Sequence, residues 1–131
     1  MNQDVTILIL THKSKKLVLD YIKELYKKFR IIIIDNSNDL DLKSVIINSY
    51  PGVEIYLIPN NGYSNQINFG SKLVTTEYFL ISNPDIRGMN ESNVLNFVKA
   101  AKELKNKFSA LGPRFLNVNP KSHKQSEDNN S

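Results

Sequence analysis

Apolar runs alternate with helical periodicities along most of this chain, and no other feature constrains its fold as strongly. Four runs rich in Ile, Leu, Val and aromatic residues are typical of strands covered on both faces; they span residues 5–10, 31–34, 53–58 and 78–81. Between them, apolar residues recur at spacings of three and four, which indicates helices that bury one side. The alternation predicts an α/β fold: a Rossmann-like, mostly parallel open sheet of about five strands with helices on both faces.

The same periodicity predicts where the helices lie. Their apolar positions fall at about residues 17–29, 42–50, 63–74 and 94–104. Ser14 is a plausible cap for the first helix, and Asn90 or Ser92 for the last. A fifth strand is predicted at residues 108–111.

Length and composition fit one domain. Residues 1–118 of the 131 are expected to form it, and the polar stretch 119–131 is predicted to be a disordered tail or a cut end. The chain has no cysteine, which fits a reducing compartment. No apolar run approaches the roughly 20 residues of a membrane span. A cytoplasmic location is therefore expected.

The net charge of +4 comes from 17 basic and 13 acidic residues. Much of the basic excess lies at 13–30 and 99–107, where the lysines mostly fall between apolar positions. They form either a solvated helix face or a surface attracted to anionic lipid, which would mean peripheral contact with the inner face of the membrane. Aromatic residues are not interleaved with the lysines, so nucleic acid is not an expected partner.

Polar residues follow each of the first four predicted strands. They are Thr11 and His12, then residues 35–37, 60–62 and 83–85. In an open parallel sheet the carboxyl ends of the strands share one edge, and ligands bind beyond that edge. The convergence of these four groups, rather than any one of them, predicts a binding site.

Several of these residues have two plausible roles. Asp35 can accept a hydrogen bond from a base or a ribose, or it can cap the next helix or close an Asx-turn. The backbone N–H groups at Asn61 and Gly62 can face phosphate at the start of a helix, or they can belong to a simple turn. His12 can stack on a base or merely end its strand.

The segment Asn83-Pro84-Asp85 interrupts the fourth apolar run. Asn-Pro and Pro-Asp are ordinary turn dipeptides. However, Asp85 is also a hard oxygen ligand suited to Mg²⁺ or Mn²⁺ on a diphosphate, whose oxygens would supply further ligands. Because Pro84 fixes its own φ and disfavours helical geometry at Asn83, the chain must leave the strand at a set angle.

Four segments, in this order and spacing, resemble the opening half of a family 2 glycosyltransferase: VTILILTHKS, IIIIDNSND, VEIYLIPNNGYSNQINFG and TEYFLISNPDI. The resemblance covers about residues 4–88, and ALGPRFLN at 110–117 is similar to the next segment of rhamnosyltransferase-like members. It implies a GT-A fold, a nucleotide-diphosphate sugar donor and a Mg²⁺ or Mn²⁺ ion. It also implies inverting transfer to a hydroxyl of a glycan or lipid-linked acceptor, as in the synthesis of cell-surface polysaccharide.

The resemblance assigns residues to the nucleotide-sugar site: Thr11, His12, Asp35, Asn61, Gly62, Asn68, Asn83 and Asp85. By that resemblance, Thr11 and Asp35 would line the nucleobase and ribose. Asp85 would hold the divalent metal, and Asn83 stands where the Asp-x-Asp motif of such enzymes has its first aspartate.

This chain also departs from the family pattern. Position 12 is usually tyrosine, but here His12 is followed by Lys13. The acceptor half is expected to be missing, and with it the carboxylate that acts as general base. The catalytic base is therefore unassigned, since the polar surroundings of Glu127 and Asp128 do not suit that role. The alternative function is a truncated or non-catalytic module that binds nucleotide sugar without transferring it.

A phospho-receiver or flavodoxin-like domain is a further alternative from another class. A receiver needs an acidic cluster after the first strand and an aspartate at the end of the third. This sequence has Thr11 and His12 at the first place and Asn60 and Asn61 at the second. The alternative is therefore disfavoured.

Overall fold

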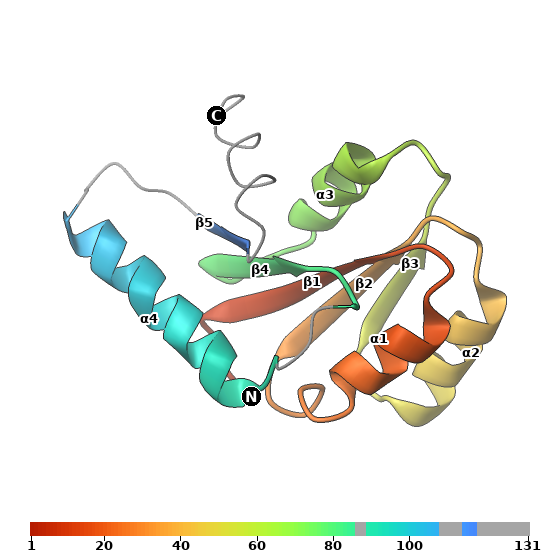
Figure 1. Cartoon of the computed structure of the whole chain (residues 1–131), viewed down its shortest axis with the longest axis horizontal. Coiled ribbons are helices and arrows are strands. Elements are labelled where there is room, and N and C mark those ends of the chain that lie inside the picture. The colour runs from red at the N-terminus through yellow and green to blue at the C-terminus, as the bar shows by residue number, and fades with distance from the viewer. Residues whose placement is uncertain (86–88, 108–113, 118–131) are drawn as a thin grey trace.

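A parallel five-stranded sheet forms the centre of the molecule (Figure 1). The computed structural model describes residues 1–85, 89–107 and 114–117. Its strands are β1 (Val5–Thr11), β2 (Arg30–Asp35), β3 (Glu54–Leu57), β4 (Tyr78–Ser82) and β5 (Arg114–Asn117). They lie in the order β3-β2-β1-β4-β5, and every neighbouring pair is parallel. The predicted α/β fold with a mostly parallel open sheet is confirmed.

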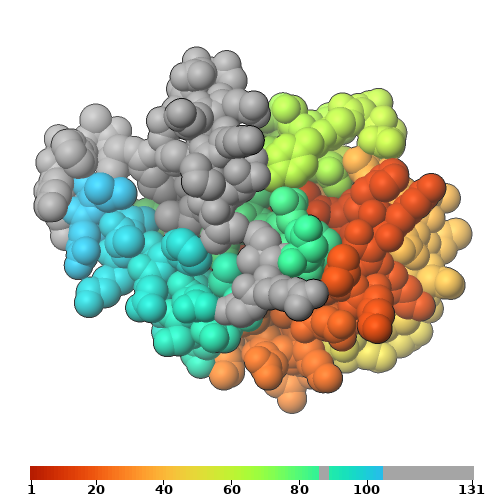
Figure 2. All heavy atoms as spheres, viewed as in Figure 1, coloured from red at the N-terminus to blue at the C-terminus, as the bar shows by residue number. Residues whose placement is uncertain are grey.

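Helices cover both faces of this sheet. They are α1 (Lys15–Ile22), α2 (Leu40–Ser49), α3 (Tyr63–Ser71) and α4 (Glu91–Lys107). In Figure 1, α1, α2 and α4 lie on one side of the sheet and α3 on the other. The space-filling view shows α1 and α2 packed together away from α3 (Figure 2). Within the described ranges, no helix is both long enough and apolar enough to cross a membrane.

Alternating residues of the central strands enter two separate cores. In β1, Ile7 and Ile9 pack with residues of α1, α2 and α4. Leu8 and Leu10 pack on the opposite face, beside the partly buried Ile67 of α3. The side chains of β2 alternate between the two cores in the same way, and residues 31–34 are all fully buried. Continuous apolar runs are required here because each central strand has a helix layer on both sides.

The first helix is shorter than the periodicity predicted. It ends at Ile22, and residues 23–28 continue in tight turns, in which the Leu25 amide donates to the Ile22 carbonyl at 3.0 Å. Leu25 and Phe29 are nevertheless buried, whereas Leu17 is 45% exposed. Successive turns keep the spacing of three to four residues, so the apolar pattern continues after the helix has ended.

The predicted caps had different outcomes. Ser14 occupies the N-cap position of α1, but its hydroxyl donates backwards to the His12 carbonyl at 2.9 Å and makes no cap bond. At α4, Asn90 accepts from the Asn93 amide at 2.9 Å, so Asn90 rather than Ser92 is the cap. The predicted strand at 108–111 and the predicted tail at 119–131 lie outside the described residues.

Candidate functional site

The strand order creates a branch point between β1 and β4. The chain runs from β1 through β2 to β3 on one side and then returns by α3 to β4 on the other side of β1. In open α/β sheets, ligands bind beyond the carboxyl ends of the strands at such a point. Thr11 is the last residue of β1, and it pairs in register with Asp35 of β2. The segment 83–85 follows β4. The predicted polar groups therefore share one edge, which we call the carboxyl rim.

Thr11 contributes an unpaired hydroxyl at the carboxyl rim. The residue is only 2% exposed, and its Oγ1 has no hydrogen-bond partner among the described residues. A buried hydroxyl without a partner costs about 1–3 kcal/mol, so such atoms are uncommon and call for an explanation. The oxygen itself is buried, as is the Tyr78 hydroxyl at the start of β4, which likewise has no partner in the described part of the chain, so a ligand would reach Thr11 Oγ1 only if the groups that cover it moved.

Asp35 closes the turn after β2. Its carboxylate accepts hydrogen bonds from the Ser37 amide at 3.1 Å, the Ser37 hydroxyl at 2.7 Å and the Asp39 amide at 3.0 Å. The residue is fully buried. The Asx-turn alternative is thus what the structure shows, and because Asp35 is fully buried, direct contact with a ligand would require neighbouring groups to move aside.

A chain of side-chain hydrogen bonds joins three strand ends. His12 Nδ1 lies 2.7 Å from Asn36 Oδ1, and Asn36 Nδ2 donates to Asn60 Oδ1 at 3.1 Å. Because the Asn36 oxygen faces the imidazole, the bond requires the proton on Nδ1, which leaves Nε2 as an acceptor when His12 is neutral. The ends of β1, β2 and β3 are therefore held together by polar side chains. The sequence placed Asn36 in the polar group 35–37 of this edge but assigned it no individual role.

An open pocket of about 480 Å³ lies between the loops after β1 and β2. Its lining is Lys13, Lys15, Ser37, Asn38, Asp39, Leu40 and Asp41. In the described part of the chain, the non-glycine residues with positive φ are Lys13, at 51°, and Asn38, at 53°, and both line this pocket. Strained backbone of this kind concentrates at functional sites.

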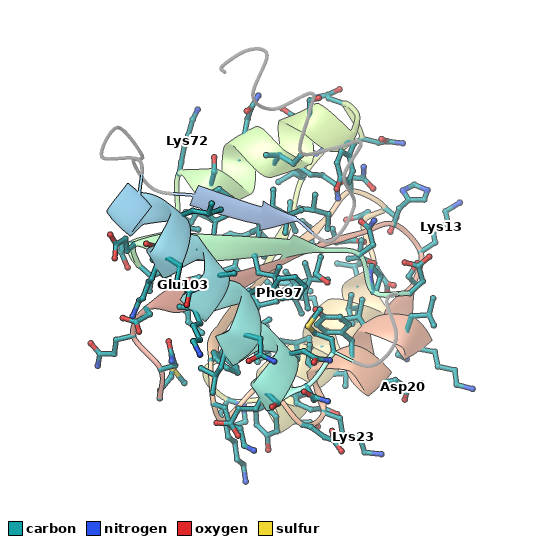
Figure 3. The ribbon with its side chains drawn as sticks, turned by 60° about the vertical axis from the view of Figure 1, so that its left-hand side comes forward. Lys13, Asp20, Lys23, Lys72, Phe97 and Glu103 are labelled. Atoms are coloured by element: carbon teal, nitrogen blue, oxygen red, sulfur yellow. The ribbon has the colours of Figure 1, made fainter. Side chains whose placement is uncertain are left out.

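The two loops around the pocket are tied together. The backbone N–H of Lys13 donates to the Ser37 hydroxyl at 2.8 Å. Ser37 is in turn bound to Asp35, so the pocket wall is connected to the end of β2. Figure 3 shows Lys13 at one end of the molecule, with Lys72 at the far end of α3.

The start of α3 lies at the same edge, where the Asn61 backbone N–H already donates to the Pro59 carbonyl at 3.0 Å. Gly62 is the N-cap residue, with φ at +96°, and no side chain caps the helix. Asn61 and Gly62 are exposed. Asn68 is also exposed, but it lies about 200° around the helix from the buried Gln66 and Gly70, on the outer face. The helix geometry therefore does not bring Asn68 to the rim.

Gln66 is a buried residue of this region that the sequence interpretation missed. It is 4% exposed, and its Nε2 donates to the carbonyls of Thr11 at 3.1 Å and Ile34 at 2.9 Å. A single side chain of α3 thus satisfies backbone acceptors at the ends of β1 and β2. The sequence could have revealed Gln66 because it is a polar residue on the inner, otherwise apolar side of the predicted helix.

A second contact that the sequence did not predict lies at the end of β4. The Tyr21 hydroxyl of α1 is 2.6 Å from the Ser82 hydroxyl, and both residues are buried. Burial raises the pKa of Tyr21 to about 12, although the hydrogen bond with Ser82 acts in the opposite direction. The phenol therefore stays protonated at neutral pH. Beyond Ser82, Pro84 is buried and Asp85 is exposed.

The donor set at the rim suits a metal that a substrate helps to hold. Among the residues that the structure describes, no three His, Cys, Asp or Glu side chains cluster as a metal cage would. Asp85 offers one exposed carboxylate, and the half-buried Asn83 can add an amide oxygen. Mg²⁺ is commonly bound by one or two carboxylates together with phosphate oxygens and water. Asp85 therefore fits a metal–diphosphate complex, not a preformed protein cage.

Comparison with known proteins agrees with this arrangement. The sequence matches the profile of Glycosyl transferase family 2 over residues 6–127. A search among curated proteins found no match. The matched region includes all four strand ends of the carboxyl rim and most of the chain. The chain therefore belongs to glycosyl transferase family 2.

Proposed function

We propose that the carboxyl rim binds a nucleotide-diphosphate sugar together with Mg²⁺ or Mn²⁺, as the donor site of an inverting glycosyltransferase. Family membership supplies the reaction class, which is sugar transfer. The observation that carries the donor site is that four polar strand ends share one edge of the sheet, the edge that contains the branch point between β1 and β4. The sugar would pass to a hydroxyl of a glycan or lipid-linked acceptor, and rhamnosyltransferase-like polysaccharide synthesis is the process that we propose.

The nucleoside would occupy the pocket side of the rim. Thr11 brings an unpaired hydroxyl, His12 an exposed imidazole, and Asp35 the carboxylate that holds the pocket wall. Lys13 and Lys15 line the pocket together with Asp39 and Asp41, so the lining is mixed in charge, and the two lysines are the groups that would approach the phosphates.

The diphosphate would lie toward β4 and the start of α3. Asp85, with Asn83 beside it, would hold the divalent metal, and the backbone at Asn61 and Gly62 would face phosphate oxygens. The bound metal would supply charge stabilisation to the departing diphosphate. Asn68 is part of the proposed site only because it lies on α3, whose first residues would face the diphosphate. No direct contact between Asn68 and the ligand is proposed.

Peripheral membrane contact is a separate part of the proposal. It rests on the exposed lysines of α1 and the turns that follow it, Lys16, Lys23 and Lys27. Asp20 and Glu24 interrupt that surface, so the expected binding is weak and sensitive to salt. Cosedimentation with anionic and neutral vesicles tests it. Equal binding to both kinds of vesicle would contradict the electrostatic contact.

Isothermal titration of the full chain with UDP-, dTDP- and GDP-sugars, with and without Mn²⁺, tests the donor site. We expect at least one donor to bind, and more tightly with Mn²⁺. A transfer assay with the same donors separates an active enzyme from a binding module. Binding with little turnover would favour the nucleotide-sugar-binding module, whereas no binding to any donor would contradict the proposed site.

A further inference from the structure

Tyr21 and Ser82 form a buried hydrogen bond between α1 and the strand that leads to Asp85. Their hydroxyl oxygens are 2.6 Å apart, and the two residues are 8% and 1% exposed. Ser82 is the last residue of β4 and already pairs with Ile9 of β1 through the sheet register. The sheet therefore holds the backbone of Ser82, and the tyrosine additionally holds its side chain.

We propose that Tyr21 is a positioning residue for the Asp85 carboxylate and that it acts through Ser82. This inference rests on the proposed metal role of Asp85. Asn83 and Pro84 alone separate Ser82 from Asp85. Pro84 is buried, its ring fixes its own φ, and it restricts the backbone of Asn83. Few free torsions therefore lie between the anchored strand end and the carboxylate.

The geometry of the metal makes such positioning consequential. Mg²⁺ requires near-octahedral coordination with oxygen ligands at about 2.0–2.1 Å. A small displacement of the Asp85 carboxylate would therefore weaken metal binding more than it weakens contacts with the nucleoside. A role confined to packing would instead lower stability and leave the effect of metal on nucleotide binding unchanged.

Tyr78 offers a matched control in the same strand. It is a fully buried tyrosine at the opposite end of β4, and its hydroxyl has no partner among the described residues. Tyr78→Phe and Tyr21→Phe remove the same atom from buried rings. Only the second change removes a hydrogen bond beside the rim.

For each of UDP, dTDP and GDP, the experiment measures the dissociation constant from the full chain without Mn²⁺ and with Mn²⁺. The ratio of the two constants for one nucleotide is its Mn²⁺ enhancement. In Tyr21→Phe we expect the Mn²⁺ enhancement to be roughly three- to tenfold smaller than in the wild type, a factor that corresponds to the free energy of one hydrogen bond. The affinity for nucleotide without metal should stay unchanged. Ser82→Ala should give the same fall, and adding Tyr21→Phe to it should change nothing further. Tyr78→Phe should retain the full enhancement.

The outcomes separate this inference from the donor-site proposal. Full enhancement in Tyr21→Phe, with enhancement also present in the wild type, would overturn the positioning role alone. A wild-type chain without any Mn²⁺ enhancement would overturn the metal role of Asp85 and this inference together. If Tyr21→Phe does not fold, Ser82→Ala decides the question, since it removes the same hydrogen bond and leaves the tyrosine ring in place.

Discussion

The Asp35 carboxylate holds residues 37–39 against the end of β2 by three hydrogen bonds. Those residues also line the pocket next to Lys13, so one buried side chain determines the shape of the proposed nucleoside site. The alternatives of a turn residue and a binding-site residue are compatible here. Removal of the carboxylate would leave the Ser37 and Asp39 donors without an acceptor.

Asp35→Ala is expected to weaken nucleotide binding at least tenfold and to lower the free energy of unfolding by about 1.5–3 kcal/mol. Titration calorimetry and urea denaturation measure the two effects. Asp20→Ala is the control, because Asp20 is an exposed carboxylate on α1 (Figure 3). Unchanged nucleotide affinity in a folded Asp35→Ala variant would exclude Asp35 from the site.

At the opposite end of the sheet, Arg30 forms a two-pronged ion pair with Glu54. Arg30 Nε donates to Glu54 Oε2 at 2.6 Å and Nη2 donates to Oε1 at 3.0 Å. The hydrogen bonds from Arg30 lower the pKa of Glu54, although partial burial opposes them. The stability from this pair is therefore fully present above the unfolded-state pKa and is lost as the pH falls through the folded-state value.

Glu54→Gln should flatten the acid limb of the stability curve between about pH 5 and pH 3. Thermal midpoints measured across that range test the expectation, with the exposed Glu103→Gln on α4 as control (Figure 3). A Glu54→Gln variant that loses stability with acid as steeply as the wild type would contradict it.

Among the elements, α3 approaches the sheet closely at Gly70, where there is no side chain between the helix and the strands. A Cβ placed on Gly70 would stand 2.5 Å from Leu8 Cδ1 and 3.2 Å from Ile34 Cγ1. That same approach brings Gln66, one turn earlier, to the carbonyls at the ends of β1 and β2. The glycine thus sets both the packing of α3 and its polar contact with the rim.

Gly70→Ala should therefore destabilise the protein by about 1–3 kcal/mol through overpacking, although alanine favours helices. Lys72→Ala, at the exposed end of α3, is the matched control (Figure 3). Adding Leu8→Val to Gly70→Ala should recover part of the loss, because it trims the side chain that clashes. Equal stability of Gly70→Ala and the wild type would contradict the close approach.

Periodicity predicted the elements well, because the continuous apolar runs at 5–10 and 31–34 suit central strands with helices on both faces. It failed at the end of α1, since tight turns after Ile22 repeat the helical spacing closely enough to bury Leu25 and Phe29. It also failed for contacts between distant segments. Nothing local in the sequence connects Tyr21 with Ser82, because their hydrogen bond depends on how α1 packs under β4.

At the scale of the whole molecule, the strand order explains why residues distant in sequence meet. Because β1 lies between β2 and β4, its end is adjacent to both Asp35 and the segment that carries Asp85. The sequence predicted that four polar strand ends would share an edge. It could not predict their order along that edge, because strand order is decided by how the helices cross the sheet.

The metal role of Asp85 is tested most directly by a nucleotide titration with and without Mn²⁺ on the wild type and on Asp85→Asn. Metal and nucleotide should each raise the affinity for the other by the same factor in the wild type. Asp85→Asn should abolish that coupling and leave metal-free nucleotide binding nearly unchanged, whereas Asp20→Asn should retain both. If Mn²⁺ strengthens binding equally in the wild type and Asp85→Asn, then Asn83-Pro84-Asp85 is only a turn.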